Sequence, residues 1–146
     1  MSLWTEVAAY IVSPLATLLA VWVAYLALHK SNEPKLLVYY RPNAHIPSLI
    51  DLTIQNTGGG DAEDLRFSAG LPINCFGIEV PHGSGSEIPL SGFPAIPSGQ
   101  AYVFDGGQYG GLENRVGDGI SFEVSYHFRG PVGFRHKRKQ RHLLGV

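Results

Sequence analysis

The chain has 146 residues, of which 45% are hydrophobic and 16% are charged, with a formal net charge of −1 and a single cysteine. One cysteine excludes an internal disulfide framework and a zinc site built from several cysteines. The histidines show no spacing typical of metal ligands, so we predict neither a metal site nor a cofactor; they are His29, His45, His82, His127, His136 and His142.

The first predicted element is an apolar helix. No formal charge occurs from Val7 to Leu28, a run of 22 residues. A helix of this length spans about 33 Å, and the hydrocarbon layer of a bilayer is about 30 Å thick. A secretory signal peptide is the main alternative, but no Lys or Arg precedes the run, and the run is longer than the apolar core of a signal peptide. We therefore predict that residues 1–30 form a single transmembrane anchor.

The residues that flank this run indicate its depth and orientation. Trp4, Trp22 and Tyr25 lie near its two ends, where aromatic rings contact lipid headgroups. Glu6 is the only side-chain charge before the run, whereas Lys30 and further basic residues follow it closely. Because cytoplasmic flanks carry the excess of Lys and Arg, we predict a location in the inner membrane with the C-terminal part in the cytosol.

Residues 31–34 form a predicted linker, and residues 35–146 form a predicted β domain. Its segments alternate apolar and polar residues between turns rich in Pro and Gly, and no helix is expected after the anchor. The fold is therefore predicted to be mainly β, an antiparallel β-sandwich, with a small β-barrel as the alternative. Strands are expected at Lys35–Tyr40, Leu49–Asn56, Glu63–Ala69, Ile73–Val80, Ala101–Asp105, Ile120–Phe128 and Val132–Gln140.

A glycine-rich turn joins two of the predicted strands. In Asn56-Thr57-Gly58-Gly59-Gly60-Asp61, glycine permits positive φ, and the Asn and Asp side chains can bond to nearby backbone. The pattern Leu52-x-Ile54-x-Asn56-x-Gly58-x-x-x-Ala62-x-x-Leu65-x-Phe67 resembles the early strand pair of bacterial CARDB-like modules with an immunoglobulin-like fold. This resemblance covers about 16 of the 146 residues. It implies an immunoglobulin-like sandwich and carries over no catalytic residue.

The layout of the whole chain carries a second resemblance. One short N-terminal anchor followed by a small β domain is similar to the layout of small bacterial single-pass membrane proteins. Some of these proteins accompany phage-defence systems. For this chain, the resemblance implies that oligomerisation in the bilayer is a toxic step.

Charge is unevenly distributed along the predicted domain. From Pro42 to Phe128 there are ten acidic residues and two basic ones, whereas Arg129 to Val146 contains six basic residues and no acidic residue. We predict a hairpin here whose basic residues protect a sheet edge, and near a bilayer the same residues contact anionic lipids. Nucleic-acid binding is disfavoured because the body is acidic. The predicted membrane-surface residues are Trp4, Trp22, Tyr25, Lys30, Arg135, Lys137, Arg138, Lys139 and Arg141.

A second glycine-rich segment runs from Asp105 to Gly111. It lacks the Lys-Ser/Thr ending of a phosphate-binding loop, so we expect a long loop between strands, and such loops often carry ligand contacts. The predicted ligand- or partner-binding residues are Asp105, Gln108, Tyr109, Asn114 and Arg115. Cys75, in an apolar segment, is predicted to be a buried packing residue. No arrangement of residues predicts catalysis, and we expect no enzyme.

Two functions are compatible with these parts. In the first, a membrane-anchored sandwich is a binding or assembly module that recruits a protein partner or self-associates through small residues of its helix. In the alternative, a small anionic ligand such as a nucleotide binds near Arg115, and the domain is a sensor. The expected partners are therefore the lipid bilayer and a protein partner or a second copy of the chain.

Overall fold

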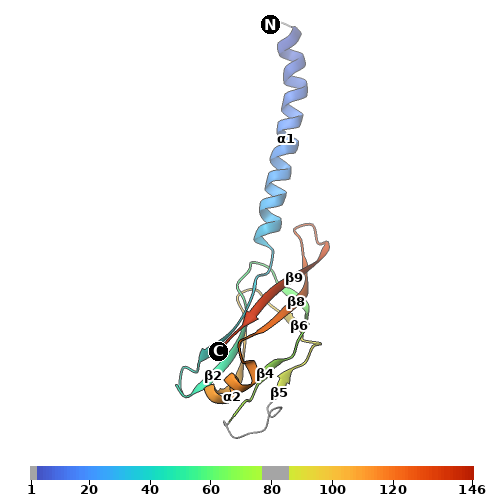
Figure 1. Ribbon diagram of the computed structural model, residues 1–146. Helices are drawn as coiled ribbons and strands as arrows, with labels where there is room; N and C mark the ends of the chain where they lie inside the picture. The colour runs from blue at the N-terminus through green and yellow to red at the C-terminus, as the bar shows by residue number, and fades with distance from the viewer. Residues whose placement is uncertain (1–2, 77–85) are drawn as a thin grey trace.

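The computed structural model describes residues 3–76 and 86–146 as a long helix followed by a β body (Figure 1). Helix α1 (Leu3–Ser31) projects from one end of this body, and none of its residues is buried. A helix that is apolar all round requires lipid or other protein around it, because water solvates such a surface poorly. As predicted, α1 is long and apolar enough to cross a membrane.

Two antiparallel sheets make up most of the β body. The first sheet has the strand order β1-β2-β7, and the second has the order β6-β3-β8-β9. The first consists of β1 (Leu36–Pro42), β2 (Leu49–Asn56) and β7 (Ala101–Gln108). The second consists of β6 (Phe93–Ile96), β3 (Ala62–Phe67), β8 (Ile120–Arg129) and β9 (Arg135–Leu144). The described remainder includes β4 (Leu71–Ile73), its partner β5 (Ser86–Ile88) and helix α2 (Tyr109–Val116).

The core lies between the two sheets, where alternate residues of facing strands meet. Leu52 and Ile54 of β2 are fully buried, and so are Val124 and Tyr126 of β8. At one edge, the backbone N–H of Leu36 in β1 donates to the side-chain Oε1 of Gln140 in β9 at 3.1 Å. This side-chain bond takes the place of a backbone ladder between the sheets, so the described strands form a sandwich and no closed barrel.

The outer face of β2 is less exposed to solvent than its alternating pattern suggests. Asp51 and Thr53 point away from the core, yet they are only 7% and 1% exposed. Strand β2 lies in the centre of its sheet, and Thr53 has Tyr39 on one side and Val103 on the other. Cross-strand neighbours of this size cover a short side chain. Position within the sheet therefore decides burial here.

The strand predictions held best where alternation was longest. Strand β2 has the predicted bounds, and β8 extends one residue beyond its prediction. The predicted strand Ile73–Val80 is wrong in its described part, because β4 ends at Ile73 and Asn74 takes a left-handed φ of 54°; residues 77–80 lie outside the described residues. Strand β9 begins at Arg135 and not at Val132, since residues 130–134 form the hairpin loop.

Helix α2 contradicts two predictions, that no helix follows the anchor and that a long loop follows Asp105. Strand β7 continues to Gln108, and α2 begins at the next residue. Leu112 and Val116 lie one turn apart and are buried, which explains the helix. The glycines that suggested a loop have a packing role, because a Cβ at Gly111 would overlap the backbone oxygen of Cys75.

Candidate functional site

The junction between α1 and the sandwich is built on the glycine turn at residues 58–60. The segment that leaves α1 crosses this turn so closely that side chains do not fit. A Cβ at Gly59 would overlap the carbonyl oxygen of Ser31, and one at Gly60 would overlap that of Asn32. None of these three glycines has a positive φ, so the expectation that the turn needs one is wrong. The turn requires glycine because the predicted linker lies on top of it.

Hydrogen bonds of the Asn56 side chain hold the same turn in place. This side chain is fully buried, and its Oδ1 accepts from the backbone N–H of Lys35 at 3.2 Å and of Gly58 at 3.0 Å. Its Nδ2 donates to the carbonyls of Gly60 at 2.7 Å and Ile96 at 3.0 Å. One amide thus joins the residue before β1, the turn and β6, and the predicted bond from Asn56 to nearby backbone is confirmed.

The last turn of α1 also packs against the root of the β8–β9 hairpin. The ring of His29 lies 4.8 Å from that of His136 and 5.6 Å from that of Phe128, centroid to centroid. A Cβ on Gly130 would lie 3.3 Å from Nδ1 of His29, so the hairpin backbone is close as well. Tyr25 stacks on His29 from one turn earlier, at 6.1 Å. Two separate contacts, the linker and this ring cluster, therefore fix the helix on the sandwich.

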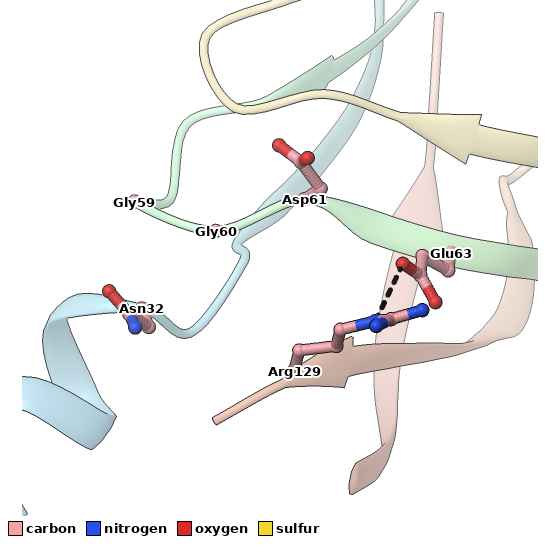
Figure 2. A pocket seen from close by; sticks show the side chains of 6 residues that line it. All are labelled: Asn32, Gly59, Gly60, Asp61, Glu63 and Arg129. Carbon is pink, nitrogen blue, oxygen red and sulfur yellow. Dashed lines mark ion pairs between the residues drawn. The ribbon is translucent and has the colours of Figure 1, made fainter. Parts of the chain in front are cut away.

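A shallow polar pocket opens beside this junction (Figure 2). Its volume is about 270 Å³, and Figure 2 shows Asn32 at the end of α1 facing the turn at Gly59 and Gly60. Across the pocket, Arg129 of β8 pairs with Glu63 of β3, with Nε and Oε1 3.4 Å apart. Among the described residues, no group of three or more His, Cys, Asp or Glu is placed to hold a metal ion. The pocket therefore offers both positively and negatively charged groups that can form hydrogen bonds.

Basic residues of β9 are divided between the two faces of the strand. Arg138 lies opposite buried Tyr126, and its Nε bonds to Glu33 of the linker at 2.6 Å. The bond to Glu33 raises the pKa of Arg138 above its usual value. On the outer face, Glu123 of β8 pairs with Lys139 at 3.0 Å and Arg141 at 3.8 Å. Part of the basic charge predicted to contact membrane is therefore neutralised within the domain, as expected for a protected sheet edge.

The remaining predicted membrane-surface residues lie along α1 or at the end of the sandwich from which α1 projects. Arg135 and Lys137 are exposed on the outer face of β9 and make no ion pair with a described acidic residue. Trp4 and Trp22 are 82% and 60% exposed on α1. Lys30 is exposed, whereas Tyr25 is partly covered by His29. The structure thus brings Tyr25, Lys30, Arg135 and Lys137 toward one end of the sandwich.

The predicted ligand-binding residues lie at the opposite end, around α2 (Figure 1). Asp105 and Gln108 are exposed on β7, and Tyr109 and Asn114 are exposed on α2. Arg115 is more covered, and its guanidinium bonds to Glu87 at 2.7 Å. The five residues share this end of the domain, but an anion at Arg115 would have to compete with Glu87.

The interior beside Arg115 is packed and carries two weakly acidic groups. Cys75 is only 3% exposed, as predicted, and its segment pairs with Gly107 through backbone bonds. Burial raises the pKa of the Cys75 thiol and raises that of the Tyr40 phenol well above its usual value. Tyr40 Oη donates to the carbonyl of Pro72 at 2.7 Å. These groups stay protonated and neutral near pH 7.

Sequence reasoning missed the features that make the junction. The hub at Asn56 and the contacts of His29 depend on residues far apart in the chain, so no local motif marks them. The run of three glycines was the one available signal, because consecutive glycines often mark a close backbone approach.

Comparison with known proteins identifies a family for this chain. The model of a domain of unknown function (DUF8453) matches residues 3–144, which include α1 and the sandwich together. No curated protein and no solved structure matches the chain. Because the match covers nearly the whole chain, the protein belongs to the DUF8453 family.

Proposed function

We propose that this is a single-pass protein of the inner membrane whose cytosolic β-sandwich is a binding and assembly module. The observation that supports this proposal is the junction of α1 and the sandwich. Because the linker packs on Gly59 and Gly60 and His29 packs on the hairpin, the domain has one orientation relative to its anchor. A module held in this way presents the same surface to every partner, or to a second copy of itself.

Self-association is supported by the lateral surface of α1. Ala9, Ser13 and Thr17 follow at intervals of four residues, so they lie along one face of the helix. The hydroxyl of Thr17 donates to the carbonyl of Ser13 at 2.9 Å, so this polar group is already satisfied in an apolar solvent. A hollow of about 360 Å³ lies beside Ala9, Tyr10, Ser13 and Pro14. Small residues of this kind let two helices approach closely.

Crosslinking in intact membranes tests whether α1 packs against α1 of a second copy through these small residues. We expect the variant Ser13→Cys, expressed as full-length protein, to give a disulfide-linked dimer on mild oxidation, because Ser13 would face the second helix. Leu15→Cys is the matched control, since Leu15 lies at nearly the same depth on the opposite face and is also exposed. Cys75 is buried and present in both variants.

Three results together would contradict the proposal: no crosslink from either position, a monomer in mild detergent, and no protein that copurifies from crosslinked membranes. A crosslink from Leu15→Cys alone would place the interface on the other face and would contradict the role of the small residues. The phage-defence setting belongs to the same proposal, and assembly in the bilayer is then the toxic step. The ligand-sensor alternative has weaker support, because Glu87 already pairs with Arg115.

A further inference from the structure

The tip of the β8–β9 hairpin exposes two apolar side chains on a closed loop. Val132 is 63% exposed and Phe134 is 68% exposed, whereas Phe128, at the root of the same hairpin, is buried. The loop is held by a bond from Gly130 N–H to the carbonyl of Phe134 at 2.9 Å, and by one from Gly133 N–H to the carbonyl of Gly130 at 2.9 Å. The apolar groups are therefore presented to solvent on an ordered turn.

This tip lies beside the last turn of α1. A Cβ on Gly130, which begins the loop, would lie 3.3 Å from Nδ1 of His29, and Figure 1 shows the hairpin pointing toward the helix end of the sandwich. If α1 crosses a bilayer, its last turn is where the chain leaves the hydrocarbon layer. The hairpin tip would then lie at the depth of the lipid headgroups, where aromatic and aliphatic side chains can bury apolar area.

The charges around the tip match an anionic leaflet. Arg129 and Arg135 are cross-strand neighbours at the base of the loop, and Lys137 follows on the same face as Arg135. Arg129 pairs with Glu63, whereas Arg135 and Lys137 are exposed and have no described acidic partner. Basic residues close to an anionic surface are attracted to it, and an apolar pair next to them adds the hydrophobic contribution.

We propose that the hairpin tip is a second membrane contact, in which Val132 and Phe134 insert among the headgroups while Arg135 and Lys137 bind anionic lipids. The contact rests on the proposed membrane span but is independent of self-association. Together with α1 it gives the protein two points of attachment to the membrane, so the whole molecule cannot rotate freely about the axis of α1. The end of the sandwich that carries the tip of the β8–β9 hairpin would then be fixed toward the lipid.

Fluorescence of the full-length protein in vesicles of anionic and zwitterionic lipid tests the contact. An environment-sensitive fluorophore is attached at Phe134→Cys in one protein and at Glu113→Cys in the control, both in a Cys75→Ala background. Glu113 is exposed on α2, at the end of the sandwich away from α1. In anionic vesicles we expect the fluorophore at position 134 to emit at shorter wavelength and to be quenched by a lipid that carries its quencher at the depth of the headgroups. Iodide in the aqueous phase should quench this fluorophore several-fold more weakly than the one at position 113.

Equal iodide quenching at both positions would overturn the tip insertion. Insertion that is the same in zwitterionic vesicles, or unchanged by Arg135→Gln with Lys137→Gln, would overturn the role of the charges. Quenching of the intrinsic fluorescence of Trp4 and Trp22, both on α1, by brominated lipid reports on the helix in the same samples. If the tryptophans are quenched while the fluorophore at position 134 is in water, only the tip contact is contradicted. If the tryptophans and the fluorophore are all in water, the membrane span itself is contradicted.

Discussion

Replacement of Asn56 by alanine is expected to lower the free energy of unfolding of the sandwich by about 4 kcal/mol or more. The substitution removes four hydrogen bonds and leaves backbone groups of Lys35, Gly58, Gly60 and Ile96 without their partner. The bond to Ile96 is buried and the other three are partly buried. A buried polar group left unpaired costs about 1–3 kcal/mol and a partly buried one less, whereas a domain of this size is stable by only about 5–15 kcal/mol. Denaturant unfolding of the full-length protein in detergent, followed by far-UV circular dichroism, measures the loss.

Asn114→Ala is the matched control for this substitution. Asn114 is exposed on α2, so the same chemical change removes no buried bond there and should alter stability by less than about 0.5 kcal/mol. Similar unfolding midpoints for the two variants would show that Asn56 does not join Lys35, the turn and β6 as described.

A valine at Gly60 is expected to force the linker away from the glycine turn. The first side-chain carbon would overlap the carbonyl oxygen of Asn32, and a backbone atom cannot move aside as a side chain can. We expect a loss of about 1–3 kcal/mol, typical of overpacking, together with looser attachment of α1. Spin labels at Lys30→Cys and Lys137→Cys, in a Cys75→Ala background, measure the distance distribution across the junction, which should broaden.

Gly145→Ala serves as the control for added volume at a glycine. A Cβ at Gly145 meets nothing within 4 Å, so neither the stability nor the distance distribution should change. A Gly60→Val protein with a wild-type melting temperature and an unchanged, narrow distribution would contradict the close passage of the linker.

The sequence predicted the parts of this protein whose signal is local and repeated. An apolar run of 22 residues predicts a long helix, and alternation along Leu49–Asn56 and Ile120–Phe128 predicts strands, because burial on one face imposes a period of two. The sandwich and the hairpin turn after Arg129 followed from the same reasoning. Short elements failed, since β5 and β6 have three and four residues and contain too few positions to show a period.

The candidate site was less predictable because tertiary contacts define it. Helix α2 contains Gly110 and Gly111, which disfavour a helix, and it forms because Leu112 and Val116 are buried against the rest of the domain. His29 looked like the end of an anchor, and its packing on Phe128 depends on residues about a hundred positions away. The basic residues of β9 were recognised, but their pairing with Glu33 and Glu123 could not be read from the chain.

We propose above that α1 lies in a bilayer and holds the sandwich at its surface. Fractionation of cells that express the full-length protein tests it most directly. After lysis without detergent, we expect the intact protein to sediment with membranes, to stay there in alkaline carbonate and to dissolve only when detergent is added. Recovery of the protein from the aqueous fraction, with its N-terminal segment still present, would contradict the claim.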